Sequence, residues 1–129
     1  MEYQVIINDK IEACEVPVLR KKVGWGSRER DYPALLERCD FHASIRSTTG
    51  ELIGFGYICG MGLEHGYMED IMIAPEYQRQ GLGTMLVKRL LKEARQRGLL
   101  IVSVNLDPEN EHFYRNCGFE IGLSGTVIY

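Results

Sequence analysis

Residues 78–84 read Gln-Arg-Gln-Gly-Leu-Gly-Thr and stand between an apolar run and an amphipathic segment that predicts a helix over 81–97. A strand that leads through a glycine turn into a helix leaves a row of backbone N–H groups without intrahelical acceptors. These donors lie at the positive end of the helix dipole and therefore form a site for phosphate oxygens. A Cβ atom at Gly81 or Gly83 would hold a pyrophosphate away from them, and Arg79 adds a positive charge. This segment predicts a ligand that carries phosphates.

Two better-known phosphate loops do not fit this segment. A P-loop ends in Gly-Lys-Ser/Thr, whereas Gly83 is followed directly by Thr84. The dinucleotide-binding fingerprint fails because Gln78 stands where its first glycine would be, and no glycine follows Gly83 at the required spacing. Taken alone, the segment is also compatible with an ordinary helix start that contains two glycines.

Length and composition indicate one ordinary globular domain over residues 1–129. No run approaches the ~20 apolar residues of a membrane span, and the start lacks the pattern of a signal peptide, so we expect a cytoplasmic protein without membrane association. The cysteines are scattered without a C-x-x-C spacing, and we expect them to be buried reduced thiols; they are Cys14, Cys39, Cys59 and Cys117. The histidines show no ligand spacing either, so no metal site is predicted.

The net charge of −3 is unevenly distributed, because residues 79–98 carry six Lys or Arg and one Glu. This segment could dock a polyanion or form a solvated helix face. Nucleic-acid binding is not expected, since the basic residues fall on one helix without interleaved aromatics and the whole chain is acidic. The acidic remainder favours a cationic second substrate.

Periodicity and turn signals predict an alternation of strands and helices. The predicted strands are 3–7, 41–46, 52–59, 67–73, 99–105, 119–123 and 126–129, and 99–105 reads as a central strand buried on both faces. The predicted helices are 12–23, 31–39, 81–97 and 107–117. This order predicts an α+β (mixed α/β) domain with a mixed, mostly antiparallel sheet flanked by helices. The single parallel pair would join 67–73 to 99–105 through the helix over 81–97.

The element order, the Gln-x-x-Gly-x-Gly of 78–83 and the segment 110–119 together resemble the GCN5-related N-acetyltransferase (GNAT) superfamily. The resemblance covers roughly residues 41–119, and members move an acyl group from acyl-coenzyme A to an amine. It implies acetyl-coenzyme A as the acyl donor, with its pyrophosphate on 78–84 and its pantetheine arm added to the exposed edge of 67–73. The implied cofactor-binding residues are Ile71, Met72, Ile73, Gln78, Arg79, Gln80, Gly81, Leu82, Gly83, Thr84 and Asn110.

Tyr114 is the candidate acid of this reaction. Transfer expels a thiolate, and a phenol of pKa ~10 can donate a proton or a hydrogen bond to a thiol of pKa ~8.5 at little cost. Asn110 lies one helical turn earlier on the same face and can reach the cofactor. The alternative is that Tyr114 is a core aromatic beside Phe113 and Asn110 an ordinary first-turn residue.

Glu69 and Asp70 are the candidates for handling the acceptor amine, which is charged at pH 7 with a pKa of ~10.4. Alternation places Glu69 with Ile71 and Ile73, whereas Asp70 faces the other way unless a bulge intervenes. A gap of ~6 pKa units corresponds to ~8 kcal/mol, which disfavours direct proton transfer. We therefore predict Glu69 as a catalytic base acting through water, Asp70 as an amine-orienting group and the N–H of Ile71 as the oxyanion donor. A solvated acidic pair at a strand start is the alternative.

One branch is more similar than others, because glucosamine-6-phosphate N-acetyltransferases share the patterns of Gly66–Ile71 and Pro108–Tyr114. Residues 1–40 do not match that branch. A sugar phosphate would require basic side chains, and the candidates are Arg20, Lys21, Lys22, Arg28 and Arg30, which equally suit a solvated surface. Trp25 is a candidate substrate-binding lid over the acceptor, or a partly buried core residue.

The sequence thus predicts an N-acetyltransferase that moves an acetyl group from acetyl-coenzyme A to the primary amine of a small molecule, directly within a ternary complex. No cysteine is paired with a base by spacing, so no thiol-acylated intermediate is expected. The alternatives are an amino-sugar-phosphate acetyltransferase and a non-catalytic acyl-coenzyme A binding module. Open edges of the terminal strands suggest a homodimer.

Overall fold

The computed structural model describes residues 2–129, and its five strands form one sheet in chain order. The strands are β1 (Val5–Ile7), β2 (Phe41–Arg46), β3 (Leu52–Gly60), β4 (His65–Ile73) and β5 (Ile101–Val104). Neighbours pair antiparallel from β1 to β4, and β4 pairs parallel with β5. The predicted α+β class, with a mixed and mostly antiparallel sheet, is confirmed.

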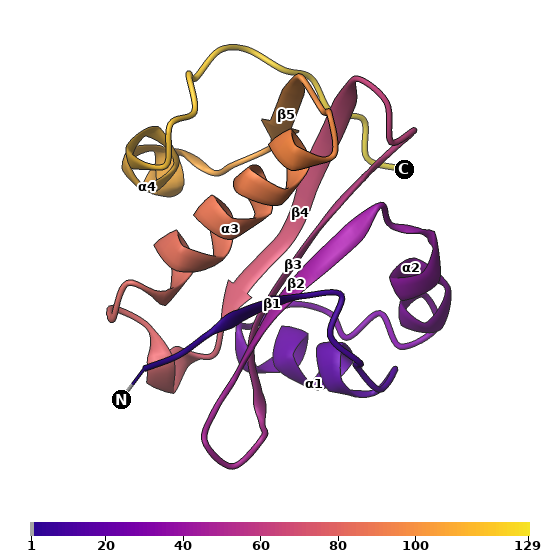
Figure 1. Cartoon of the computed structure of the whole chain (residues 1–129), viewed down its shortest axis with the longest axis vertical. Helices are drawn as coiled ribbons and strands as arrows, with labels where there is room; N and C mark the ends of the chain where they lie inside the picture. The colour runs from indigo at the N-terminus through magenta and orange to yellow at the C-terminus, as the bar shows by residue number, and fades with distance from the viewer. Residues whose placement is uncertain (1) are drawn as a thin grey trace.

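Helices cover both faces of this sheet, with α3 on one face and α1 and α2 on the other (Figure 1). The helices are α1 (Glu15–Lys22), α2 (Tyr32–Arg38), α3 (Leu82–Gln96) and α4 (Glu111–Asn116), with short 3₁₀ turns at Pro75–Tyr77 and Pro108–Asn110. The helical periodicity of 81–97 predicts an apolar stripe, most of which is buried: Leu82, Leu86, Val87, Leu90 and Ala94 are buried, and Leu91 is half-buried. Gly98, with φ +91°, follows the end of α3 as its left-handed cap.

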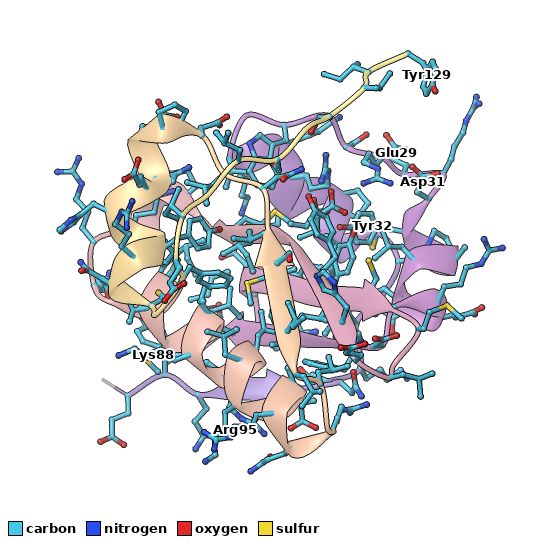
Figure 2. All side chains as sticks on the ribbon, turned by 90° about the horizontal axis from the view of Figure 1, so that it is seen from above. Glu29, Asp31, Tyr32, Lys88, Arg95 and Tyr129 are labelled. Atoms are coloured by element: carbon cyan, nitrogen blue, oxygen red, sulfur yellow. The ribbon has the colours of Figure 1, made fainter. Side chains whose placement is uncertain are left out.

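The basic side chains of α3 form a solvated face. Lys88 and Arg95 are exposed and point outward from the helix (Figure 2). Arg89 and Arg97 both pair with Glu93, at 3.1 and 2.8 Å. Because these cations lie along the outside of one helix, this arrangement favours the solvated-face interpretation over a polyanion site.

Strand β4 contains one extra residue opposite Gly56. Phe55 pairs with Met72 and Tyr57 with Glu69, so two residues of β4 face one of β3. Asp70 lies in this bulge with φ +53°, in the left-handed region. The expected alternation is therefore wrong for Glu69: it lies with Tyr57 and Asp70 toward α1 and α2, whereas Ile71 faces α3 beside Leu90.

The end of the chain differs from the prediction. Strand β5 is an edge strand with Ile101 48% exposed, and not a central one. Within residues 2–129, no strand forms at 119–123 or 126–129, and Tyr129 ends an unpaired extended segment (Figure 2). The apolar run of β5 could not reveal this, because a continuous run does not specify how many neighbours a strand has.

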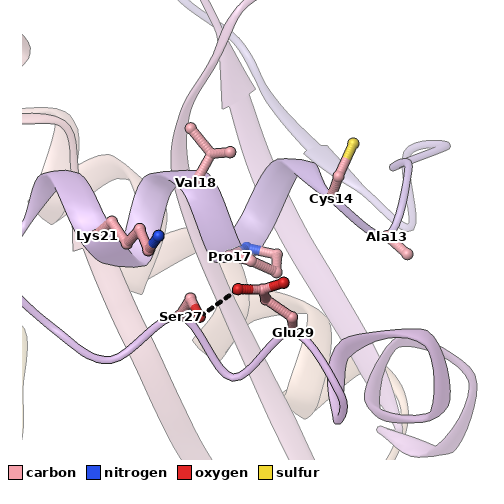
Figure 3. A pocket seen from close by; sticks show the side chains of 7 residues that line it. All are labelled: Ala13, Cys14, Pro17, Val18, Lys21, Ser27 and Glu29. Atoms are coloured by element: carbon pink, nitrogen blue, oxygen red, sulfur yellow. Dashed lines mark hydrogen bonds between the residues drawn. The ribbon is translucent and has the colours of Figure 1, made fainter.

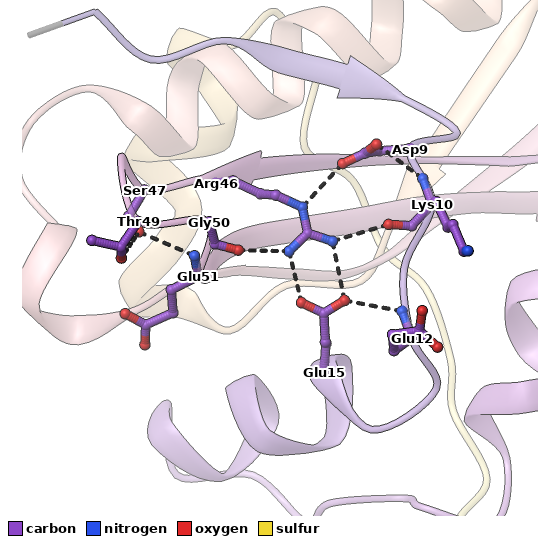
Figure 4. Close-up of polar contacts among 9 residues, drawn as sticks. All are labelled: Asp9, Lys10, Glu12, Glu15, Arg46, Ser47, Thr49, Gly50 and Glu51. Atoms are coloured by element: carbon purple, nitrogen blue, oxygen red, sulfur yellow. Dashed lines mark hydrogen bonds and ion pairs between the residues drawn. The ribbon is translucent and has the colours of Figure 1, made fainter.

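Arg46 connects four parts of the N-terminal half (Figure 4). Its guanidinium contacts Asp9 at 3.1 Å and both oxygens of Glu15 at 2.7 and 3.0 Å. It also donates to the backbone carbonyls of Lys10 and Gly50. The hydrogen bonds from Arg46 hold the pKa of Glu15 below its usual value. One side chain thus ties the start of α1 to β2 and to the β2–β3 turn.

We expect Arg46→Met to lower the free energy of unfolding by about 2 kcal/mol, because the charged hydrogen bonds are only partly exposed. A carboxyl with a lowered pKa contributes stability above its unfolded pKa of ~4.3 and loses it as pH falls through the folded pKa. The stability difference between the two proteins should therefore narrow below about pH 4. Urea denaturation across pH tests this. The exposed Arg28–Asp31 pair provides the control Arg28→Met, with a loss of about 0.5 kcal/mol or less; equal losses would contradict the role of Arg46.

Candidate active site

Strands β4 and β5 separate halfway along β4. The pairing runs from His65 with Ile101 to Met68 with Val104. Beyond that point, within residues 2–129, β4 has no neighbour on this side, so the backbone of 69–73 presents an open edge. An extended chain that resembles a peptide can add to such an edge by backbone hydrogen bonds.

The 78–84 loop continues this edge into α3. Within residues 2–129, its N–H groups from Arg79 to Thr84 donate to no backbone carbonyl, and the first helical bond runs from Met85 N–H to Gly81 at 3.1 Å. Arg79 and Gly81 have φ +64° and +82°, which turns the chain sharply before the helix. The side-chain amide of Gln78 donates to the carbonyl of Ile73 at 2.9 Å and braces this turn. The unused donors and the open space above Gly81 fit phosphate oxygens.

A cavity of about 430 Å³, here called the donor-side cavity, joins the open edge to this loop. All of the predicted cofactor-binding residues line it except Gln80, which is exposed beside it. Leu82 and Met72 are both buried members of this wall. Tyr77 and Phe113 also line the cavity. The sequence did not single these two out, because Tyr77 lies in the 3₁₀ turn before α3 and Phe113 reaches the cavity only by packing beside Gly83 of α3.

A second cavity of about 630 Å³, here called the acceptor-side cavity, adjoins the first and shares Ile71, Asn110 and Tyr114 with it. The other residues that line it are Arg20, Trp25, Tyr67, Met68, Glu69, Asp70, Val104, Asn105, Leu106, Asp107, Ser124, Thr126 and Ile128. The last three come from the chain end. Ser124 donates to the side chain of Asn105 at 3.2 Å, and Asn105 donates to Thr126 at 3.5 Å.

Tyr114 lies where the two cavities meet. Its ring is 8% exposed and packs edge-on against Phe113 and Phe119, with centroids 5.0 and 5.6 Å away. Burial raises the pKa of Tyr114 to about 12, so its hydroxyl stays protonated near neutral pH. The ring is therefore a core aromatic and also a cavity wall. Asn110, one turn earlier, is exposed in the same wall.

Glu69 has a partner that the sequence analysis missed. The hydroxyl of Tyr57 donates to Oε2 of Glu69 at 2.5 Å. Burial, followed by this hydrogen bond, raises the pKa of Tyr57, so the phenol remains a neutral donor. The signal was the hairpin of 52–59 with 67–73, whose correct register would have placed Tyr57 opposite Glu69.

Asp70 is engaged by the protein itself. Its Oδ2 accepts hydrogen bonds from the hydroxyl of Tyr32 and from Nη1 of Arg20, the latter at 2.6 Å. The Arg20 and Asp70 side chains are only 10% and 9% exposed. Arg20 also lies over the ring of Trp25, 5.3 Å from its centroid. Trp25 is 42% exposed, so it stands at the rim of the acceptor-side cavity and is not a core residue.

The other basic candidates of the N-terminal segment do not line the acceptor-side cavity. Lys22 pairs with Glu51 and Arg28 with Asp31. Lys21 lines a separate cavity of about 410 Å³ between α1 and the 27–29 segment (Figure 3). Arg30 is exposed and lines none of these cavities.

Cysteine burial is less complete than the sequence suggested. All four are free, but Cys14 is exposed and Cys39 and Cys59 are half-buried, which leaves Cys117 as the buried one. Among residues 2–129, no cluster of three or more His, Cys, Asp or Glu could hold a metal ion. No helix in this part of the chain combines the length and apolar character that a membrane span requires.

The sequence model of the Acetyltransferase (GNAT) family matches residues 11–119, which is most of the chain. The chain belongs to the GNAT family. Among the solved structures that share its fold are two with the following similarity. The protein of unknown function SA2161 from Meticillin-resistant Staphylococcus aureus has a TM-score of 0.84 at 22% identity, covering 98% of this chain and 99% of that chain. The GNAT family N-acetyltransferase YhbS from Escherichia coli, solved in complex with CoA, has a TM-score of 0.77 at 21% identity, covering 92% and 68%.

Curated relatives are acetyltransferases by name. Histone acetyltransferase TAP1 from Glycine max is 28% identical over 133 residues, 92% of this chain and 58% of that protein. Glucosamine 6-phosphate N-acetyltransferase 1 from Oryza sativa is 41% identical over 54 residues, 42% of this chain and 33% of that protein. The chain therefore spans less than two thirds of either relative, and their different names leave the acceptor open.

We expect Gly81→Ala to lower the free energy of unfolding by roughly 1–2 kcal/mol, because a Cβ atom is strained at φ +82°. Thermal and urea denaturation measure the loss. Gly122→Ala is the matched control, since a Cβ atom there meets open space without a left-handed φ, and it should be neutral or slightly stabilising. Equal stability of the two variants would show that the loop does not require its left-handed residue.

Proposed function

We propose that this protein moves an acetyl group from acetyl-coenzyme A to the primary amine of a small molecule, directly within a ternary complex. The observation that carries this proposal is the shared wall of Ile71, Asn110 and Tyr114 between the two cavities. A donor on one side of that wall and an amine on the other meet at Tyr114. Membership of an acetyltransferase family supports the choice of reaction.

In this proposal the donor occupies the donor-side cavity, and its pyrophosphate accepts from the unused N–H groups of 79–84. The open edge at Ile71–Ile73 hydrogen-bonds the pantetheine arm. Bound acetyl-coenzyme A supplies the reactive thioester. The fit rests on this chain's own donors, and the CoA complex of YhbS supports the ligand class.

Tyr114 acts as a hydrogen-bond donor to the departing sulfur. With its pKa at about 12, complete proton transfer to a thiolate of pKa ~8.5 is uphill by about 5 kcal/mol. Hydrogen bonding still stabilises the thiolate as its charge develops. The N–H of Ile71 donates a hydrogen bond to the acetyl oxygen and stabilises the negative charge that develops there. The high pKa therefore refines the expected acid role of Tyr114.

Glu69 removes the proton of the amine through water. Its carboxylate lines the acceptor-side cavity and is held by Tyr57. Holding one oxygen leaves the other free to accept from a water molecule. Proton transfer from an alkylamine to a carboxylate is costly, so an amine of lowered pKa is the best acceptor.

Charge in the acceptor-side cavity favours a neutral or cationic acceptor over a sugar phosphate. Of residues 2–129, Arg20 is the one Lys or Arg that lines this cavity, and Asp70 neutralises it. Glu69 and Asp107 add negative charge there. An amino-sugar phosphate stays an alternative because of the Oryza sativa relative, but it would lack a free cationic partner.

A non-catalytic acyl-coenzyme A binding module is the alternative from another class. A thiol-release assay over a panel of amines separates the two, because a binding module would bind acetyl-coenzyme A without turning over any amine.

We also propose a cytoplasmic location, which the four free cysteines support. We propose in addition that two copies of the chain form a homodimer through the exposed edge of β5. No nucleic-acid partner is part of this proposal.

We expect Tyr114→Phe to lower kcat at least about tenfold, because the hydrogen bond to the leaving sulfur is lost. The calorimetric Kd for acetyl-coenzyme A should change less than about threefold, since the aromatic wall remains. Tyr3→Phe is the control, because Tyr3 lines neither cavity. In the wild type, Tyr114 should cause no loss of activity below about pH 11, given its pKa of about 12. Unchanged kcat in Tyr114→Phe would remove Tyr114 from the reaction.

We expect glucosamine to be a better acceptor than glucosamine 6-phosphate, by at least about fivefold in kcat/KM at low salt. The phosphate would meet Glu69 and Asp107 without a free cation. Thiol release with both sugars at matched concentration measures the ratio. A preference for the phosphorylated sugar would instead assign the protein to the amino-sugar-phosphate class.

A further inference from the structure

The Arg20 side chain is buried and contacts both the loop that carries Trp25 and Gly26 and the bulge of β4. Its Nε donates to the carbonyl of Gly26 at 2.6 Å, and its Nη1 contacts Asp70 at 2.6 Å. Its guanidinium lies 5.3 Å from the centroid of the Trp25 ring. A backbone hydrogen bond also joins these residues, because Trp25 N–H donates to the carbonyl of Arg20 at 2.9 Å. A single guanidinium thus joins residues 25–26 to Asp70.

Asp70 occupies a strained position between two groups of the proposed reaction. Its φ of +53° lies in the left-handed region, which costs free energy for residues with a Cβ atom, less for Asp than for Ala. Glu69 precedes it and Ile71 follows it, so the backbone at residue 70 sets the directions of the Glu69 side chain and the Ile71 N–H. The Asp70 carboxylate accepts from Arg20 and from Tyr32, which is fully buried.

We propose that Arg20 is a positioning residue that acts through Asp70: with Tyr32, it holds the left-handed backbone of the bulge and couples it to the Trp25–Gly26 loop. This inference rests on the proposed function and adds to it. In this proposal the Asp70 carboxylate stabilises the backbone of the bulge and does not contact the amine. Glu69 and the residues at the rim of the acceptor-side cavity orient the amine instead. A buried ion pair of this kind contributes little net stability, but it selects one local geometry.

Two substitutions of Asp70 test whether its carboxylate holds the backbone or contacts the amine. Asp70→Ala and Asp70→Gly both remove the carboxylate and leave Arg20 without it, but only Gly tolerates φ +53° without strain. If the carboxylate holds the backbone, kcat of Asp70→Gly should exceed that of Asp70→Ala by at least about fivefold. If it orients the amine, both variants lose kcat equally and acceptor KM rises equally. Equal kcat values, within about twofold, overturn the proposal.

Arg20→Met tests the guanidinium itself. It should lower kcat about tenfold and leave the Kd for acetyl-coenzyme A within about twofold. In the Asp70→Gly background the same substitution should cost little more, since Arg20 acts through residue 70. If Arg20→Met lowers kcat by the same factor in the wild type and in Asp70→Gly, Arg20 does not act through residue 70. Lys22→Met is the matched control on α1, because its pair with Glu51 is partly exposed and lies outside the cavities.

Two readouts do not depend on turnover. Trp25 is the one tryptophan of the chain, so loss of Arg20 should shift its fluorescence emission, whereas Lys22→Met should not. Hydrogen exchange at amides 69–72 should be faster in Asp70→Ala than in Asp70→Gly or the wild type. If no amine is turned over, the proposed function fails, and these two measurements still decide the role of Arg20. Unchanged emission in Arg20→Met, or equal exchange in the two Asp70 variants, overturns it.

Discussion

The extra residue of β4 opposite Gly56 is the constraint on which the arrangement of the site depends. It turns Glu69 and Asp70 toward α1 and α2 and leaves Ile71 facing α3. The same part of β4 is where pairing with β5 ends, so backbone donors become available beside the carboxylates. In our proposal, the hydrogen bonds that the Asp70 carboxylate accepts from Arg20 and Tyr32 offset the free-energy cost of its left-handed backbone. Local strain and site geometry therefore have one origin.

The two cavities differ in how they bind charge. The donor-side cavity presents backbone N–H groups and the positive end of α3, which can hold phosphates without a dense cluster of basic side chains. The acceptor-side cavity presents carboxylates and one neutralised arginine. Tyr114 separates these environments as a buried neutral phenol. This contrast supports an anionic donor on one side and an amine on the other.

The match to the GNAT family ends at residue 119, while Ser124, Thr126 and Ile128 of the acceptor-side cavity lie beyond it. The loop that carries Trp25 lies within the matched range. The donor-side cavity lies wholly within the matched residues, whereas the acceptor-side cavity also uses the chain end beyond them.

Local patterns in the sequence determined the α3 stripe, the Gly98 cap and the glycine turn before α3, because each depends on neighbours within a few residues. The bulge, the Tyr57 partner of Glu69 and the Arg20–Asp70 contact were decided only by tertiary structure. Each depends on the register between strands or on a contact across 50 residues of chain. The edge position of β5 has the same origin, since an apolar run specifies burial but not which segment supplies the neighbour.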